Sequence, residues 1–150
     1  MRYKEIRAWK KVFEKDLTYV SYELKEIVKT PAFIMLEGEM GAGKTTFSKV
    51  FLGEEETMSP TYNILYEKED MLHADFYRIE SREEVIQLEL GLYLEGKNFF
   101  LAEWSKKLFH QIDPELEEQF SSYLLEIEVT DSNQESHKDA RNFILYSIKK

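Results

Sequence analysis

Residues 36–47 read LEGEMGAGKTTF and form the clearest chemical pattern in the chain. Gly38 to Thr45 match G-x-x-x-x-G-K-[ST], the spacing of the phosphate-binding P-loop or Walker A motif. Glycines allow backbone turns that other residues avoid, so successive N–H groups can point at phosphate oxygens. A helix starting directly after the loop adds its positive N-terminal end. The pattern therefore predicts a site for a nucleoside triphosphate.

Each polar position of this loop has a predicted role. Lys44 would reach the β- and γ-phosphates, and the Thr45 hydroxyl would bind Mg²⁺. The phosphate-holding residues are predicted to be Gly38, Glu39, Met40, Gly41, Ala42, Gly43, Lys44, Thr45 and Thr46. With ordinary glycine usage, chance would produce this pattern in roughly one such chain in a few hundred. A glycine-rich turn that binds nothing is therefore the weaker interpretation.

A magnesium–nucleotide site also needs an acidic side chain at the end of a neighbouring strand. Two apolar runs end in one, MLHAD at Asp75 and NFFLAE at Glu103. Either acid alone is more often a surface residue. Together with a P-loop they predict that at least one faces the metal, and the residues do not decide which.

The spacing of apolar residues predicts the elements that position this site. AFIMLE (residues 32–37) has the composition of a buried strand, and a helix is expected over residues 44–52. An earlier helix, capped by Asp16 or Thr18, is expected to stop at Thr30-Pro31.

The remaining segments alternate between strand and helix patterns. We expect a hairpin over residues 62–77, a helix over 81–90 with a capping box, and a buried strand over 98–104. Residues 122–129 and 140–148 indicate a C-terminal antiparallel hairpin, with one apolar face made by Tyr123, Leu125, Ile127 and Val129. The predicted fold class is α/β, a P-loop NTPase-like mixed, mainly parallel sheet flanked by helices.

Composition places the chain among ordinary globular proteins, with 150 residues, 43% hydrophobic and 33% charged. This length predicts a single domain over residues 1–150. No apolar run approaches the ~20 residues needed to cross a bilayer, and the N-terminus is unlike a signal peptide, so no membrane contact is expected. The lack of cysteine excludes disulfides and fits a cytoplasmic protein.

The net charge of −9 argues against non-specific binding to DNA or other nucleic acids. Residues 1–15, however, form a basic N-terminal segment with a local charge of +4, which leaves −13 for the remainder. We favour a solvated segment, and a contact with an acidic partner or RNA is the alternative.

Several classes of nucleotide enzyme lack their motifs here. No Asp is followed by Gly three residues later and no Asn-Lys pair occurs, which excludes the usual guanine-binding switch. A small-molecule kinase stays open as the alternative, although none of the five arginines lies in an obvious lid. A nucleotide-binding regulator without turnover is a third hypothesis.

Five segments occur together in a recognisable order: LEGEMGAGKTTF, SPTY (59–62), HADFYRI (73–79), ELGL (89–92) and LAEW (101–104). With them the chain closely resembles the TsaE (YjeE) family over about residues 18–141. This resemblance implies ATP and Mg²⁺ as ligands, and an ATPase that is weak alone and stimulated by the TsaB–TsaD complex. It implies a requirement for threonylcarbamoyladenosine modification of tRNA beside the anticodon, with only indirect contact to the tRNA.

The resemblance also assigns residues. Catalytic positions are Lys44, Thr61, Asp75 and Glu103, and the metal positions are Thr45, Asp75 and Glu103. Thr61 corresponds to a switch-like threonine that approaches the γ-phosphate. Asp75 would orient water or the metal's ligands, and Glu103 would bind Mg²⁺ directly or through its ligands.

Three further positions would approach the nucleotide by the same resemblance: Lys15 and Thr18 near the adenine, and Lys138. The segment between Thr46 and Ser59 is shorter than usual for the family. Judged from the residues alone, His73 is slightly favoured as a structural histidine over a proton carrier, and Trp104 is favoured as a core residue over one lining the site.

Overall fold

The computed structural model describes residues 1–54, 64–130 and 140–149. Seven strands of these ranges form one sheet in the order β1-β7-β6-β2-β5-β4-β3. The strands are β1 (Arg2–Val12), β2 (Ala32–Glu37), β3 (Leu65–Lys68), β4 (Met71–Asp75), β5 (Phe99–Glu103), β6 (Ser121–Val129) and β7 (Arg141–Lys149). The helices are α1 (Leu17–Ile27), α2 (Lys44–Leu52), α3 (Arg82–Gln87), α4 (Leu90–Leu94) and α5 (Phe109–Ile112). Short 3-10 turns are η1 (Glu14–Asp16), η2 (Lys106–Leu108) and η3 (Asp113–Glu115).

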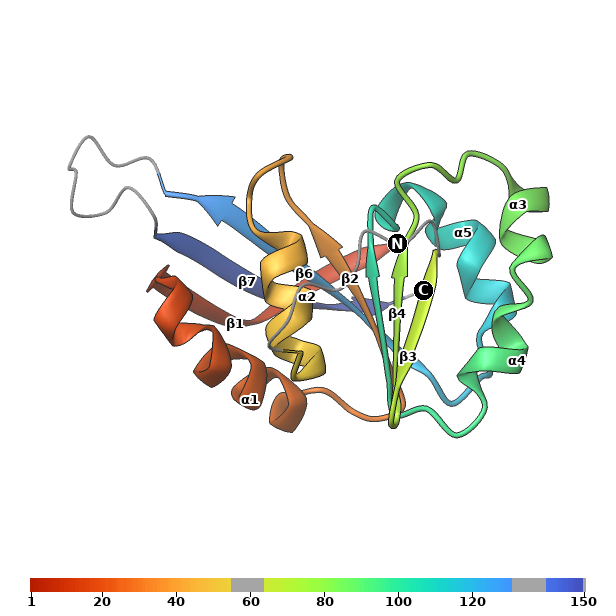
Figure 1. Cartoon of the computed structure of the whole chain (residues 1–150), viewed down its shortest axis with the longest axis horizontal. Coiled ribbons are helices and arrows are strands. Elements are labelled where there is room, and N and C mark those ends of the chain that lie inside the picture. The colour runs from red at the N-terminus through yellow and green to blue at the C-terminus, as the bar shows by residue number, and fades with distance from the viewer. Residues whose placement is uncertain (55–63, 131–139, 150) are drawn as a thin grey trace.

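The sheet is mixed, as predicted, with its parallel strands in the middle (Figure 1). Strand β2 lies parallel to both β5 and β6, and β4 is parallel to β5. Antiparallel pairs lie at the two sides, where β3 pairs β4 and where β1, β7 and β6 follow one another. The C-terminal hairpin is thereby confirmed, and the sheet is partly rather than mainly parallel.

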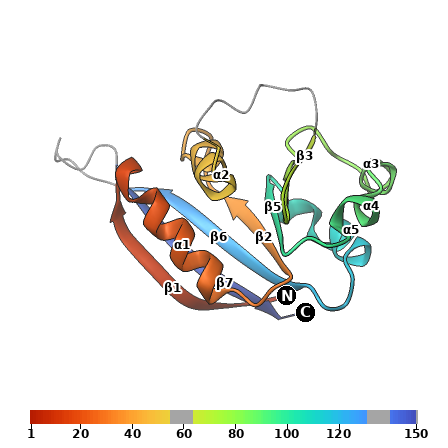
Figure 2. The same cartoon turned by 60° about the horizontal axis from the view of Figure 1, so that its bottom comes forward.

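Helices cover both faces of this sheet, and β2 is buried between them. Ala32, Ile34 and Leu36 belong to the core beneath α1 and α2, whereas Phe33 and Met35 belong to the core shared with α3, α4 and α5. Figure 2 shows α1 and α2 on one side of β2 and the other helices beyond β5 and β3. Burial on both faces explains why this strand reads as a continuous apolar run.

Most predicted elements occur close to their predicted bounds. β2 and α2 have the bounds expected from the sequence, and the hairpin over residues 62–77 forms as β3 and β4. Ser81 caps α3 by accepting a hydrogen bond from the Glu84 N–H (3.2 Å). The turn predicted at residues 131–133 lies outside the described ranges.

One local prediction was wrong. The Asp16 carboxylate does not cap α1, because it accepts the Phe13 N–H (3.0 Å) and closes the η1 turn instead. Val129 continues the alternation of Tyr123, Leu125 and Ile127 along β6, although 49% of its surface is exposed. No helix in the described ranges is long and apolar enough to cross a membrane.

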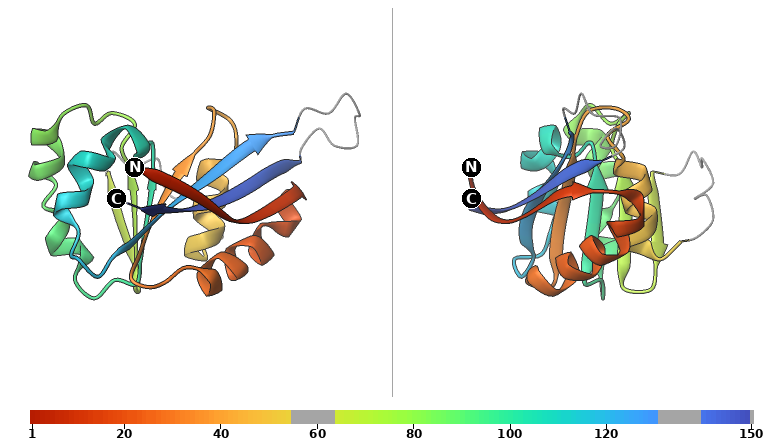
Figure 3. Two further views of the ribbon diagram at one scale, coloured as in Figure 1. Left: turned by 180° about the vertical axis from the view of Figure 1, so that it is seen from behind. Right: turned by 90° about the vertical axis from the view of Figure 1, so that its left-hand side faces the viewer.

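The basic N-terminal segment is part of the sheet, and most of its basic side chains are exposed to solvent, as the favoured interpretation expects: Arg2, Lys4, Lys10, Lys11 and Lys15. It forms β1, which pairs with β7 along the edge of the sheet and brings the two termini side by side (Figure 3). Trp9 and Val12 are buried in the core beneath α1. The Glu23 carboxylate of α1 accepts the Trp9 indole N–H (2.7 Å) and pairs with Arg7 (2.9 Å). These donors lower the pKa of Glu23, although burial opposes them.

Replacing Trp9 by alanine should therefore destabilise the whole protein. Loss of a buried indole costs about 3–5 kcal/mol, measured as the change in the free energy of unfolding by urea. Lys10→Ala, on the exposed neighbour, is the matched control and should change that free energy by less than about 0.5 kcal/mol. Equal stability of Trp9→Ala and wild type would mean that β1 does not pack as described.

Candidate nucleotide-binding site

The loop between β2 and α2 has a backbone that only glycine fits at several points. Gly41 and Gly43 have φ angles of 85° and 106°, which side-chain-bearing residues rarely adopt. Gly38 is restricted by space, because a Cβ there would lie 2.7 Å from the Ile127 carbonyl oxygen of β6. The loop thus passes against β6 and then turns directly into the first residue of α2.

Lys44 lies folded over this loop. The residue is buried, and its Nζ donates to the backbone carbonyls of Gly38 and Glu39. The same Nζ is 3.8 Å from the centroid of the Trp104 ring, a distance at which a cation is attracted to an aromatic face. A lysine held in this way concentrates positive charge at the loop, where an anionic phosphate would be attracted.

Glu103, the last residue of β5, is a buried carboxylate with three hydrogen-bond partners. It accepts from the Thr45 hydroxyl (3.2 Å) and the Ser48 hydroxyl (3.2 Å), both on α2. On its other side lies His73 Nε2 of β4, at 2.8 Å. With only 4% of the Glu103 side chain exposed, these partners replace the water that a carboxylate normally requires.

This geometry leaves Thr45 suited to bind a cation. Because its hydroxyl proton is directed at Glu103, the oxygen lone pairs remain available to a metal. Mg²⁺ prefers oxygen ligands and keeps several waters, so one hydroxyl beside a carboxylate fits its chemistry. Among the described residues, no three acidic or histidine side chains are grouped to hold a metal by themselves. Phosphate and water oxygens would therefore have to complete its coordination.

Asp75 ends β4 in direct register with Glu103, so both predicted acids reach the same edge of the sheet. Their surroundings differ, however. Asp75 is exposed and its carboxylate accepts the Tyr77 N–H (3.0 Å) rather than a group of the phosphate loop. The structure thus places Glu103 against α2 and leaves Asp75 facing solvent.

Trp104 lies at the site and not in the core, which corrects the interpretation favoured from the sequence. It is half-buried, has a φ angle of 57°, and stacks edge-on against Tyr77 with ring centroids 5.1 Å apart. The left-handed backbone at Trp104 turns the chain sharply after Glu103, which brings the indole back over Lys44.

A cavity of about 420 Å³ adjoins the loop at Gly43 and Thr46. Phe13, Glu14 and Lys15 also line it, as does Arg141 from β7, so its walls carry two cations and one carboxylate. Lys15, which the resemblance puts near the adenine, therefore lines the same cavity as Gly43 and Thr46 of the loop. Thr18 is exposed on α1 and is not among the residues lining this cavity.

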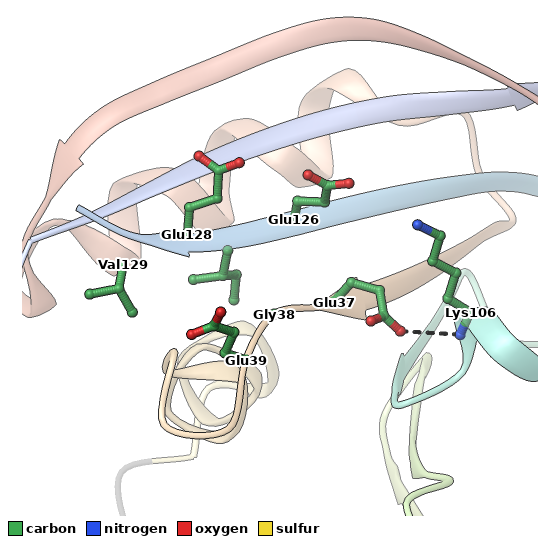
Figure 4. Close-up of a pocket in the computed structure, with 8 residues that line it drawn as sticks. Glu37, Gly38, Glu39, Lys106, Glu126, Glu128 and Val129 are labelled. Atoms are coloured by element: carbon green, nitrogen blue, oxygen red, sulfur yellow. Dashed lines mark hydrogen bonds between the residues drawn. The ribbon is translucent and has the colours of Figure 1, made fainter. Parts of the chain in front are cut away.

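A larger cavity of about 580 Å³ lies on the other flank of the loop, between Gly38 and β6 (Figure 4). Its walls carry one lysine, Lys106, and four carboxylates, those of Glu37, Glu39, Glu126 and Glu128. The Glu37 carboxylate accepts the Lys106 backbone N–H (3.3 Å). Like charges at contact distance repel, so the smaller cavity suits a nucleotide better than the larger one.

Comparison with known proteins identifies the family. A sequence model described as "Threonylcarbamoyl adenosine biosynthesis protein TsaE" matches residues 13–141. The chain belongs to the TsaE family. Two curated relatives carry the name tRNA threonylcarbamoyladenosine biosynthesis protein TsaE. The Rickettsia felis protein is 34% identical over 81% of this chain and 72% of its own length. The Bacillus subtilis protein is 33% identical over 71% of this chain and 72% of its own length.

The fold agrees with a solved structure as well. The crystal structure of Bacillus subtilis YdiB superposes with a TM-score of 0.63 at 24% identity, covering 99% of this chain and 89% of that chain. This confirms the predicted α/β class. Membership of the TsaE family gives the chain a role in tRNA threonylcarbamoyladenosine biosynthesis.

Two residues that the TsaE resemblance singled out, Thr61 and Lys138, lie outside the described ranges, as do residues 55–59 of the shortened segment. The structure adds two residues that the sequence did not single out. Ser48 follows Lys44 by one helical turn, and its hydroxyl donates to the Glu103 carboxylate. The i, i+4 spacing from Lys44 could have indicated that Ser48 lies on the same face of the helix. Arg141 donates to the Ala42 carbonyl (3.0 Å), which lies 99 residues away in the sequence. No local sequence pattern could have predicted this contact.

Gly38→Ala tests the packing of the TsaE phosphate loop against β6. The added methyl group cannot avoid the Ile127 carbonyl without a backbone shift, so unfolding should become easier by about 1–3 kcal/mol. Gly91→Ala in α4, where nothing lies within 4 Å of the added atom, is the control and should not destabilise. Thermal denaturation of both variants measures this, and an unaffected Gly38→Ala would contradict the described approach of loop and strand.

Proposed function

We propose that this protein is a Mg-ATP-binding ATPase required for threonylcarbamoyladenosine modification of tRNA beside the anticodon. Its hydrolysis is weak alone and is stimulated by the TsaB–TsaD complex. The observation that carries the proposal is the Thr45–Glu103 hydrogen bond beneath a P-loop, because it joins a phosphate site to a buried acid suited to magnesium. Family membership supports the pathway and the partners.

In this proposal the loop and Lys44 bind the triphosphate. Backbone N–H groups of residues 38–43 and the N-terminal end of α2 provide donors, and Lys44 exchanges its contacts with the Gly38 and Glu39 carbonyls for phosphate oxygens. The adenine enters the cavity lined by Phe13 and Lys15. Lys138 and Thr18 belong to the same proposed nucleotide surface, and Thr61 is proposed to sense the γ-phosphate.

The two acids then divide the remaining work. Magnesium, when bound, neutralises phosphate charge. Thr45 supplies a metal ligand, and Glu103 fixes the Thr45 hydroxyl and accepts from water in the metal's coordination sphere. Asp75 is exposed at the same strand edge, where it can orient a water molecule toward the phosphate.

Slow hydrolysis without a partner follows from the positions of the cations. Arg141 and Lys44 are the cationic side chains that bind the phosphate loop among the described residues, and both bind its carbonyls. Lys44 is proposed to move to the phosphates, but Arg141 stays bonded to the loop. In the part of the chain that the structure describes, the site therefore lacks the further arginine that usually stabilises the charge of the transferring phosphoryl group. TsaB–TsaD is proposed to complete the site. The protein acts in the cytoplasm, with tRNA held by the complex and not by this chain.

Lys44→Ala should abolish tight Mg-ATP binding. Removing the ammonium should weaken the affinity for Mg-ATP by about tenfold to a hundredfold, because the bound polyphosphate would lose its main cation. Calorimetry measures this affinity. Lys49→Ala, another lysine of α2, serves as the control and should bind as wild type does. Failure of well-folded wild type to bind Mg-ATP, with or without TsaB–TsaD, would refute the proposed function.

Measuring the rate of ATP hydrolysis distinguishes the role of Glu103 from that of Asp75. With TsaB–TsaD present, Glu103→Gln should lower the rate of phosphate release by about a hundredfold or more and raise the magnesium requirement. Asp75→Asn should lower the rate and leave the magnesium requirement unchanged. Rapid hydrolysis by wild type alone would contradict the role of the partner.

Two outcomes would favour the other functions. Transfer of labelled γ-phosphate to a metabolite, instead of release as inorganic phosphate, would indicate a small-molecule kinase. Equal hydrolysis by wild type and Glu103→Ala, with unchanged ATP affinity, would indicate a regulator without turnover.

A further inference from the structure

Arg141, the first residue of β7, connects the C-terminal hairpin to the phosphate loop. Its Nε donates to the Ala42 carbonyl (3.0 Å), and its Nη1 donates to the Ala140 carbonyl (3.1 Å). The residue is half-buried and pairs in the sheet with Val12 on one side and Val129 on the other. A guanidinium fixed by two carbonyls and two neighbouring strands has little freedom to move.

The bonded carbonyl belongs to a stretch of the loop that has a glycine on each side. Ala42 lies between Gly41 and Gly43, whose positive φ angles of 85° and 106° belong to a region that glycine adopts more readily than other residues. In a trans peptide the carbonyl and the following N–H point in opposite directions. Holding the Ala42 oxygen toward Arg141 therefore directs the Gly43 N–H to the other side of the chain.

We propose that Arg141 is a positioning residue for phosphate binding, which fixes the Ala42–Gly43 peptide so that the Gly43 N–H is presented to the triphosphate. The inference rests on the proposed nucleotide binding. Without the guanidinium, this peptide can rotate and present a carbonyl oxygen to the phosphates, which repels them. Charge-assisted hydrogen bonds are about twice as strong as neutral ones, so Arg141 is well suited to select one peptide orientation.

Arg141 also lines the cavity beside Phe13 and Lys15, so a direct contact with the base or ribose is the competing explanation. Comparing ATP with tripolyphosphate distinguishes the positioning role from a direct contact with adenosine. Tripolyphosphate contains three linked phosphates as ATP does, but no adenosine. A positioning residue affects both ligands by the same factor. A residue that contacts adenosine affects only ATP.

The experiment measures binding of Mg-ATP and Mg-tripolyphosphate by calorimetry to wild type, Arg141→Met and Arg141→Lys. Arg141→Met should weaken both ligands by the same factor, about tenfold to a hundredfold, and Arg141→Lys should lose less because it keeps one charged donor. Arg82→Met, at an exposed arginine of α3, is the matched control. The Gly43 amide resonance in ¹⁵N-labelled protein should shift in Arg141→Met without ligand.

Each outcome decides the inference. Loss of ATP binding alone, or wild-type affinity for both ligands in Arg141→Met, overturns it. If Arg141→Met does not fold, the folded Arg141→Lys variant decides: equal weakening of both ligands supports the role and unchanged binding refutes it. Wild type that binds neither ligand would refute the proposed function itself, a result distinct from a variant that binds like wild type.

Discussion

Burial of the Glu103 charge is the constraint on which the site depends. A carboxylate removed from water costs several kcal/mol unless donors replace its hydration. Here the donors come from separate elements, Thr45 and Ser48 from α2 and His73 from β4. The charge is therefore tolerated only when β5 lies between β2 and β4 and α2 packs over that edge, as the strand order provides. The fold itself therefore brings the partners of Glu103 together.

The same constraint separates two acids that the sequence presents as equivalents. Glu103 and Asp75 share a register position, yet the loop and α2 follow β2, which neighbours β5 and not β4. Glu103 is consequently covered by α2, whereas Asp75 stays exposed and is held by the Tyr77 N–H. Parallel strands bring such residues to one edge, and the position of a single helix gives them different chemical environments.

Elements that depend on interactions between residues close in the sequence could be predicted, whereas those that depend on distant residues could not. The bounds of β2 and α2 were predicted because local pattern, a buried run and the loop motif, determines them. β1 was not predicted as a strand, since its conformation depends on pairing with β7 at the far end of the chain, and strand formation depends strongly on such context. Trp104 was predicted to lie in the core because tryptophan is usually buried. The left-handed backbone conformation of Trp104 after β5 cannot be predicted from the amino-acid composition.

If the proposed function holds, the cations of the site account for weak ATP hydrolysis without a partner. Lys44 and Arg141 contact the loop from opposite directions, one from α2 and one from β7, and both donate to its backbone carbonyls. The Arg141 contact shapes the loop, and Lys44 is proposed to bind the phosphates already in the ground state, so both favour the ground state and the transition state alike. Binding the ground state and the transition state equally does not accelerate the reaction. Acceleration needs a positive charge that stabilises the transferring phosphoryl group more strongly in the transition state. If the proposed function holds, that charge must come from a group that reaches the site only in the assembled complex.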